Sequence, residues 1–278
     1  MTSQPEIGDL PSTFRLRRRT PGSFVLVPCP RLGRSIRCQG QLEAAAAVVL
    51  SACPVVASLR EQPLTVWYAW RKTSHAVQFQ LLDERPAKRR EQDCRFSYVV
   101  PDFLVAMQDG CQRLIEVKPS RKLGHPDVRR KLAVAAAFAA ARGWSFHALT
   151  ERELFRGPLL ANLRLLARYR ATAHQARLLK QLTDRVADGP QRAGDLAANS
   201  GELAQTATIR AALFHLLASG RLDCDPRTAA LDDNTLVSPG GTILWDPFDS
   251  VWAPSGCSTD APSGSSGNLR PTASSPAT

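Results

Sequence analysis

The sequence predicts an α/β fold, in which a mixed β-sheet is flanked by helices and is followed by a smaller helical domain. Two apolar runs on either side of Asp109-Gly110 predict a β-hairpin with a tight turn. A helical pattern over 128–143 and a strand over 144–149 come after this hairpin. Because a strand, a helix and a strand in that order imply a right-handed crossover, the sheet should contain parallel as well as antiparallel neighbours.

The N-terminal part contributes a basic arm, a helix and further strands to this prediction. Residues 1–33 are rich in Pro, Arg and Thr, and we expect them to be loosely ordered. An alanine-rich run over 41–51 predicts a helix with Glu43 in its first turn. The β-branched and aromatic residues of 65–70 predict a strand, and 96–107 predicts one or two more.

The sequence becomes mainly helical beyond residue 155. Helices are predicted over 159–170 and 171–186 and in the run that stops at Gly220, and a strand pair over 221–237 could follow as a wing. This order suggests a winged helix-turn-helix, although a purely structural bundle fits the same pattern. The predicted division is a basic N-terminal arm, an α/β domain, a winged-helix-like domain and a disordered tail, at 1–33, 34–155, 156–240 and 241–278.

Composition narrows the classes of partner and compartment. The chain has 278 residues and a formal net charge of +11, which favours a nucleic acid as partner, although a basic surface kept for solubility is the alternative. The seven cysteines include no CxxC pair and no finger-like His spacing, so we expect reduced thiols in a cytoplasmic protein and no zinc site. The longest apolar run, Ala44 to Leu50, is too short to cross a bilayer, and no membrane partner is expected.

Two acids and one amine are predicted to converge on the hairpin. Glu116 and Lys118 are two residues apart on one strand, so their side chains project from the same face, and Asp102 opens the partner strand. Carboxylates suit Mg²⁺, with Mn²⁺ as the alternative, and such cations activate phosphodiester hydrolysis. We expect Asp102 and Glu116 to bind the metal with the Val117 carbonyl, Glu43 to complete the metal site, and Lys118 to orient or deprotonate the attacking water.

The segments PDFLV and IEVKP have the spacing of the PD-(D/E)xK nuclease superfamily, which they resemble. The order LE, REQP, VPDFLV and IEVKPSRKL, followed by a winged-helix-like half, more narrowly resembles the TnsA endonucleases of heteromeric transposases, over about Ile36 to Val237. The resemblance implies a restriction-endonuclease-like fold in a bacterial protein. It also implies a Mg²⁺-dependent hydrolase that cuts DNA at the 5′ ends of a mobile element.

The same resemblance implies partners and site residues. The partners would be a DDE-type strand transferase (TnsB-like), which cuts the 3′ ends, and an AAA+ regulator (TnsC-like), which contacts the C-terminal half. By position, the family's helical acid is Glu43, its motif aspartate is Asp102, its second acid is Glu116 and its lysine is Lys118.

Other functions stay open at this point. The chain could be a stand-alone restriction or repair nuclease, a non-catalytic winged-helix DNA-binding regulator, or a module that recruits proteins, and an isolated Glu-x-Lys is commonly a surface salt bridge. Basic residues after the hairpin could grip the DNA backbone or form a solvated face: Arg121, Lys122, Arg129, Arg130 and Lys131. We interpret His125 as incidental, Gln62-Pro63 as a turn, and Trp67, Tyr68 and Trp70 as packing residues.

Overall fold

A four-stranded mixed sheet lies at the centre of the computed structural model, which describes residues 25–29, 33–73, 77–88, 90–91 and 93–245. The strand order is β10-β9-β8-β3. β8 pairs antiparallel with both β3 and β9, whereas β10 pairs parallel with β9. The four strands are β3 (Val56–Glu61), β8 (Phe103–Met107), β9 (Gln112–Val117) and β10 (Ser145–Leu149).

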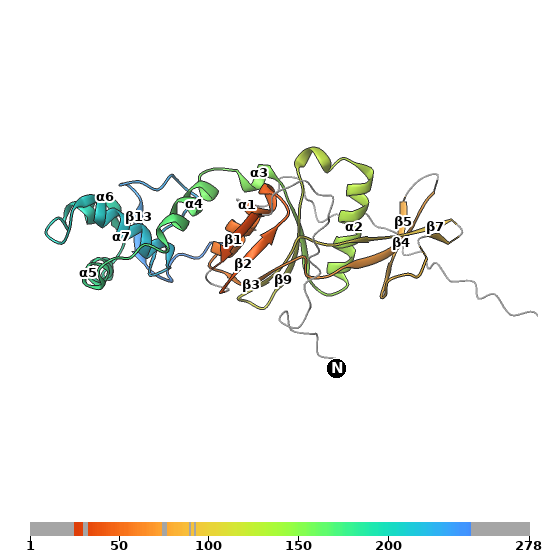
Figure 1. Cartoon of the computed structure of the whole chain (residues 1–278), viewed down its shortest axis with the longest axis horizontal. Coiled ribbons are helices and arrows are strands. Elements are labelled where there is room, and N and C mark those ends of the chain that lie inside the picture. Colours follow the sequence, from red (N-terminus) through yellow and green to blue (C-terminus); the bar gives the residue numbers. More distant parts are fainter. Residues whose placement is uncertain (1–24, 30–32, 74–76, 89, 92, 246–278) are drawn as a thin grey trace, which may run out of the picture.

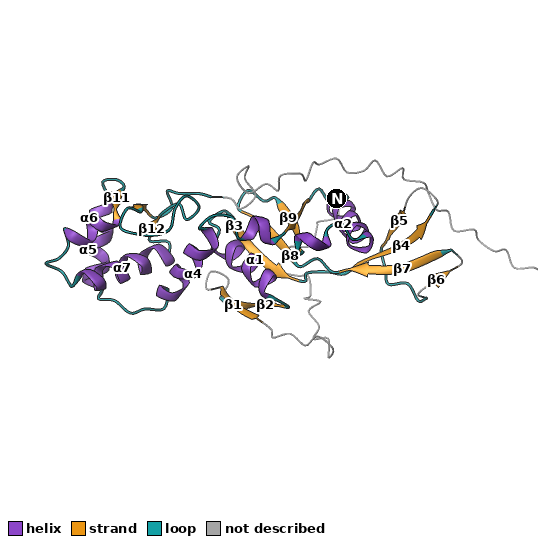
Figure 2. Ribbon diagram, turned by 90° about the horizontal axis from the view of Figure 1, so that it is seen from above, coloured by secondary structure: helices purple, strands orange, loops and turns teal. Residues whose placement is uncertain are grey.

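Two helices cover this sheet on opposite faces (Figures 1 and 2). The helix α1 (Gln41–Ala52) packs in one core with Phe103, while α2 (Pro126–Ala140) packs in another with Leu104. Because neighbouring residues of a strand project to opposite sides, the two helices lie on different faces. The predicted mixed sheet flanked by helices is therefore confirmed.

The local signals of the sequence account for these elements. Gly110 adopts φ +85° in the hairpin turn after β8, and Gly143 adopts φ +70° three residues after α2. Both conformations favour glycine, which has no Cβ to clash. The predicted hairpin, the two helices and the crossover to β10 are all present.

A second sheet, with the order β5-β4-β7-β6, extends beyond α2 toward one end of the molecule (Figure 2). It confirms the predicted strand over 65–70, and the region 96–107 contains parts of two strands, β7 and β8. Neither β5 nor β6 was predicted from the sequence. The four strands are β4 (Val66–Lys72), β5 (Val77–Leu82), β6 (Arg90–Glu91) and β7 (Cys94–Val99).

The prediction of a loosely ordered arm over 1–33 is wrong for residues 25–29. Val25–Cys29 form β1, which pairs antiparallel with β2 (Arg34–Cys38), and the side chains of Val27 and Cys29 are buried against α1. Pairing with β2 and burial of alternate side chains order this segment. Residues 1–24 and 30–32 lie outside the described part of the chain.

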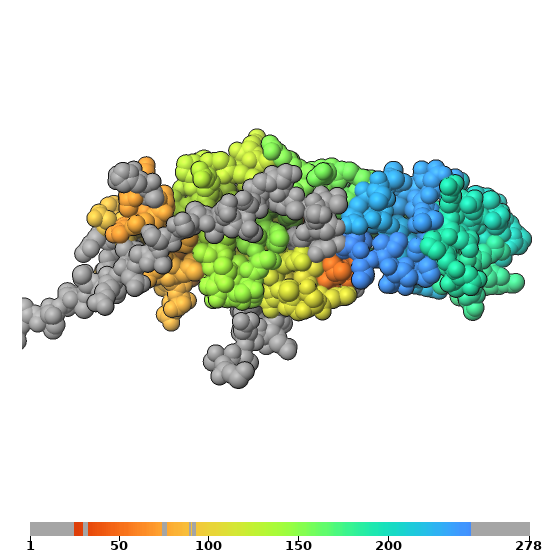
Figure 3. Space-filling view, turned by 180° about the vertical axis from the view of Figure 1, so that it is seen from behind, coloured from red at the N-terminus to blue at the C-terminus, as the bar shows by residue number. Residues whose placement is uncertain are grey.

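The C-terminal half is mainly helical and occupies the other end of the molecule (Figures 1 and 3). Its second core contains side chains of four helices and of a three-stranded antiparallel sheet with the order β11-β13-β12. The elements are α3 (Glu151–Leu154), α4 (Leu159–Tyr169), α5 (Ala176–Val186), β11 (Gln191–Arg192), α6 (Ala193–Ala198), α7 (Thr206–Ala218), β12 (Leu222–Asp223) and β13 (Leu236–Pro239). As predicted, α4 bridges the two parts of the chain, because Leu163 belongs to the first core and Leu166 to the second.

The predicted disordered tail over 241–278 is wrong at its beginning. Trp245 is only 6% exposed and packs in the first core, and its carbonyl accepts a hydrogen bond from the Cys53 thiol at 3.2 Å. Burial of an indole outweighs the Gly and Ser signals around it. Residues 246–278 lie outside the described part of the chain.

No disulfide joins the cysteines of the described residues. Among the helices that the structure describes, none has both the length and the apolar character needed to cross a membrane.

Candidate active site

The hairpin of β8 and β9 places Asp102 and Glu116 opposite each other. Phe103 pairs with Ile115 in this hairpin, so the residue before Phe103 faces the residue after Ile115. The Val117 backbone N–H donates to Asp102 Oδ2 at 2.7 Å, which holds the aspartate against the end of β9. The 8% exposed Asp102 and the 3% exposed Glu116 therefore form a buried pair of acids at one end of the hairpin.

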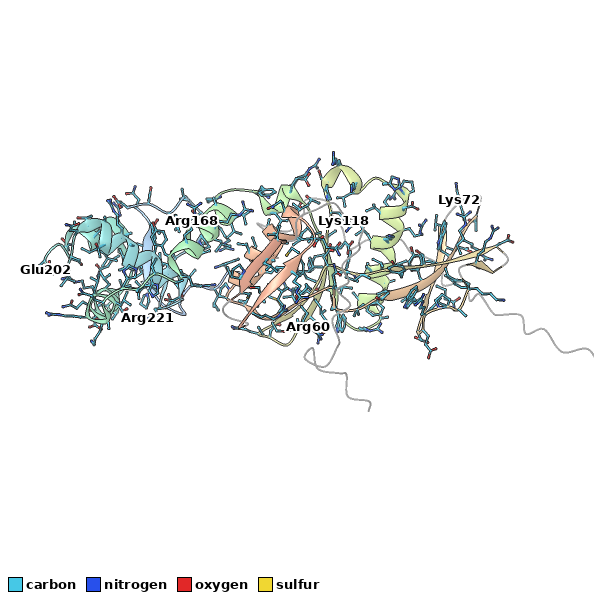
Figure 4. All side chains as sticks on the ribbon, viewed as in Figure 1. Arg60, Lys72, Lys118, Arg168, Glu202 and Arg221 are labelled. Carbon is cyan, nitrogen blue, oxygen red and sulfur yellow. The ribbon has the colours of Figure 1, made fainter. Side chains whose placement is uncertain are left out.

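Lys118 lies between these two carboxylates. Its Nζ is 2.5 Å from Glu116 Oε1 and 3.6 Å from Asp102 Oδ2, and it donates to the Val117 carbonyl at 3.3 Å. Figure 4 shows this lysine in the central part of the molecule, away from both ends. The structure thus brings together three of the four candidate catalytic residues, and it places the Val117 carbonyl beside them.

Burial makes the charged form of both acids unfavourable. Burial and the neighbouring Asp102 carboxylate raise the pKa of Glu116 to about 8. Burial also raises the pKa of Asp102, although Lys118 and the Val117 N–H oppose this. Burial alone would lower the pKa of Lys118, but Asp102 and Glu116 raise it above its usual value, so the amine is a cation.

Glu43 lies near the pair but makes a different contact. Its Oε2 accepts a hydrogen bond from the Gln39 backbone N–H at 2.7 Å, at the start of α1. Burial and the Asp102 carboxylate raise the pKa of Glu43 to about 7. Glu43 therefore belongs to the same electrostatic environment as Asp102, while its carboxylate is held by the backbone just before α1.

The donor set fits a divalent cation. Three partly or fully buried acids share one ammonium group, and Glu116 Oε2 is buried with no hydrogen-bond partner among the described residues. Hard cations such as Mg²⁺ prefer carboxylate and carbonyl oxygens, and they favour the ionised form of such acids. Within the described residues, no group of three or more His, Cys, Asp and Glu side chains is close enough to form a metal site by itself. Lys118 occupies the space between Asp102 and Glu116 instead.

Two hydrogen bonds that hold the chain after β9 in place were not predicted from the sequence. The Lys118 N–H donates to the Leu149 carbonyl at 2.9 Å, and two residues later the Ser120 N–H donates to Glu151 Oε2 at 2.9 Å. These bonds fix the chain after β9 to the start of α3, and only a helix start at Thr150 could have been read from the sequence.

On the other side of Asp102, Gln62 adopts φ +42° and its N–H donates to the Asp102 carbonyl at 2.8 Å. A non-glycine residue in this conformation is uncommon. Its position indicates that the predicted turn at Gln62-Pro63 also holds the backbone of Asp102.

The basic residues after the hairpin divide into two groups. Four of them are exposed, namely Arg121, Lys122, Arg129 and Lys131. Arg130 points inward instead: it pairs with Asp127 at 2.7 Å, and its guanidinium lies 3.7 Å from the centre of the Trp70 ring. The hypothesis that Arg130 grips DNA is therefore wrong, because this side chain packs α2 onto β4. His125 caps α2 by accepting from the Asp127 N–H at 3.3 Å.

One known family matches the region around this site. Residues 53–151 match the family model described as "TnsA-like endonuclease N terminal". The match contains Asp102, Glu116 and Lys118 and begins after α1, which carries Glu43. No curated protein matches the chain.

Proposed function

Because residues 53–151 belong to the TnsA-like endonuclease N-terminal family, we propose that the chain is the metal-dependent DNA endonuclease subunit of a heteromeric transposase. It would hydrolyse phosphodiester bonds at the 5′ ends of a mobile element. The observation that carries this proposal is the convergence of Asp102, Glu116 and Lys118 at the end of one hairpin.

Each residue has a role that follows from its charge and position. Asp102 and Glu116, with the Val117 carbonyl, would hold a Mg²⁺ ion, or Mn²⁺ in its place, and Glu43 would complete the acidic surroundings. The bound ion supplies Lewis acidity and lowers the pKa of water. Lys118 would position the attacking water and stabilise negative charge on the phosphate, since its raised pKa keeps the amine protonated.

The surface around the site suits a duplex. The exposed Arg121 and Lys122 on the turn after β9, and Arg129 and Lys131 on α2, would contact backbone phosphates near the cut. We further propose that the C-terminal half is a winged-helix-like domain, because the order α5, β11, α6, α7, β12, β13 puts helices before a small antiparallel strand pair.

The proposed protein partners are a DDE-type strand transferase (TnsB-like) and an AAA+ regulator (TnsC-like). A hollow of about 250 Å³ in the C-terminal half offers a surface for a protein contact. Its apolar lining comes from Leu213, Phe214 and Leu217, with Arg210 and Asp233 at the side.

The test is a cleavage assay with the full chain, Mg²⁺, the strand transferase and DNA carrying the element ends. We expect cutting at the 5′ ends, and we expect Asp102→Asn to abolish it while binding to the same DNA stays within about twofold. Asparagine keeps the size of the side chain and an acceptor for the Val117 N–H. Equal cutting by the wild type and this variant would contradict the site.

Glu84→Gln is the matched control, because Glu84 is an exposed acid away from the hairpin. It should cut like the wild type. Efficient site-specific cutting without the strand transferase would favour a stand-alone restriction or repair nuclease. Salt-dependent DNA binding with no cutting in Mg²⁺ or Mn²⁺ would favour a non-catalytic DNA-binding regulator.

A further inference from the structure

The second sheet has one face that α2 covers and one face that it does not. Val66, Tyr68 and Trp70 of β4 belong to the core that contains α2. Because side chains alternate along a strand, Trp67 projects from the opposite face, and its cross-strand partner Tyr98 does the same. We call this opposite face of β4, β5 and β7 the outer face.

The outer face is aromatic and accessible. Trp67 and Tyr98 lie with ring centroids 5.0 Å apart, and Tyr98 is 37% exposed. Phe96 projects from the same face, because it is two residues before Tyr98 on β7. None of these three rings belongs to the hydrophobic cores formed by the described residues. Tyr98 is exposed and Trp67 and Phe96 are half-buried, so the three rings lie at the surface with part of each ring accessible.

The surface is also basic. The guanidinium of Arg85 lies 5.7 Å from the centre of the Trp67 ring, and Arg71 projects from the outer face of β4. The strands β4, β5 and β7 contain no Asp or Glu. A row of aromatic rings beside arginines, with no acid on the strands, complements a polyanion that carries flat, stackable groups.

We propose that the outer face binds unpaired bases of a DNA strand next to the cut, by stacking them on Trp67, Tyr98 and Phe96. Only an unpaired base exposes its ring face to a protein, because the bases of a duplex stack on their neighbours. Arg85 and Arg71 neutralise the phosphates of this strand. This proposal rests on the proposed function, because that function makes the bound strand DNA.

The outer face lies close to the candidate catalytic hairpin along the chain. Tyr98 comes four residues before Asp102, so the two are at most about 14 Å apart along the backbone. A strand whose scissile phosphate lies at Asp102 can therefore reach the aromatic rings within a few nucleotides. Bases that unpair beside the cut would be held there.

The experiment measures binding of the full chain to a fluorescein-labelled 12-nucleotide oligothymidine and to a blunt duplex, in EDTA, by fluorescence anisotropy. We expect Trp67→Ala and Tyr98→Ala each to weaken single-strand binding about fivefold or more, because aromatic stacking contributes this much per base. Trp67→Phe, which keeps a ring, should recover most of the affinity. Duplex binding should change less than about twofold in all three variants.

The control is Val77→Ala, because Val77 is 42% exposed on the same sheet but projects from the other face. It should bind both DNAs like the wild type, and thermal melts should show that every variant is folded. Unchanged single-strand binding by the folded Trp67→Ala variant would overturn the proposal. So would an equal loss of single-strand and duplex binding, which would indicate a general electrostatic effect. Loss of strand-transferase binding with unchanged DNA binding would assign the face to a protein partner and overturn it too.

The two proposals fail separately. If Asp102→Asn abolishes cutting but Trp67→Ala leaves oligothymidine binding intact, the binding role proposed for the outer face is wrong and the nuclease assignment stands. If Trp67→Ala weakens oligothymidine binding but the wild type never cuts DNA, the stacking surface stands and the nuclease assignment is wrong.

Discussion

The two oxygens of the Glu116 carboxyl group have different surroundings. Oε1 contacts Lys118 at 2.5 Å, whereas Oε2 is buried with no hydrogen-bond partner among the described residues. Such a group is unfavourable in its ionised form, and its pKa is raised from 4.5 to about 8. Between pH 4.5 and about 8, Glu116 keeps its proton in the folded, metal-free protein, whereas the same side chain has lost it in the unfolded chain. The free energy of unfolding should therefore fall as the pH rises from about 4.5 to about 8.

Glu116→Gln removes this titration and keeps an acceptor for Lys118. Above pH 8 the metal-free variant should be more stable than the wild type, by about 1–3 kcal/mol, while its DNA cutting is lost. Urea unfolding in EDTA at pH 5.5 and pH 9 measures the difference. The exposed Glu84→Gln variant should follow the wild type at both pH values. A parallel loss of stability in the wild type and Glu116→Gln would show that Glu116 is not the titrating group.

The Cys38 thiol reports on the same acidic environment. Burial, followed by the charges of Glu43, Glu61 and Asp102, raises its pKa to about 12. The thiolate is the reactive form, so iodoacetamide at pH 8 should leave Cys38 unmodified while it alkylates the exposed Cys111. Peptide mass spectrometry after a timed reaction compares the two sites. Faster labelling of Cys38 than of Cys111 would mean that β2 is not packed against α1.

The turn of the β8–β9 hairpin determines which residues of the two strands face each other. Gly110 has φ +85°, whereas Gly124, in the loop before α2, does not have a positive φ, and both have open space where a Cβ would lie. Gly110→Ala should cost about 1–2 kcal/mol of unfolding free energy because it forces a side chain into the left-handed region. Gly124→Ala should change stability by less than about 0.5 kcal/mol. Chemical denaturation of both variants tests this, and equal losses would contradict it.

Elements whose signals are local could be predicted from the sequence. The Asp-Gly turn of the hairpin and the alanine-rich runs of α1 and α2 depend on neighbouring residues alone. The turn pairs β8 with β9 and so brings Glu116, Lys118 and Asp102 together. β3 was missed, because the strand is defined by its pairing with β8, a contact between distant residues. The inward position of Arg130 was missed for a similar reason, since it depends on how α2 packs on β4.

The position of Glu43 relative to Asp102 also depends on contacts between distant elements. Its place in a first helical turn could be predicted, but its nearness to Asp102 depends on how α1 packs on the sheet. The same holds for β1, which resembles a basic arm until β2 pairs with it, and for Trp245, which follows a glycine pair and still returns to the first core.

At the scale of the whole molecule, α4 connects two cores that are otherwise built from separate stretches of the chain. Leu159, Leu160 and Leu163 pack in the first core, and Leu166 packs in the second. Between them, the buried Asn162 makes three hydrogen bonds with the segment after β12. Its amide nitrogen donates to the carbonyls of Pro226 and Ala229 at 2.9 and 2.7 Å, and its oxygen accepts from the Leu231 N–H at 3.1 Å.

This arrangement predicts that the two cores unfold together and that Asn162 couples them. Asn162→Ala removes the hydrogen-bond partner of three backbone groups, of which only the Pro226 carbonyl belongs to a buried residue. The change should cost about 1–3 kcal/mol, which is more than a surface change in the same helix would cost. We expect the single calorimetric transition of the wild type to separate into two, with the transition of the C-terminal half at the lower temperature. Ala161→Ser, at the exposed neighbouring position, should keep one transition near the wild-type temperature. One transition in Asn162→Ala at an unchanged temperature would show that packing of the leucines alone couples the first core to the second.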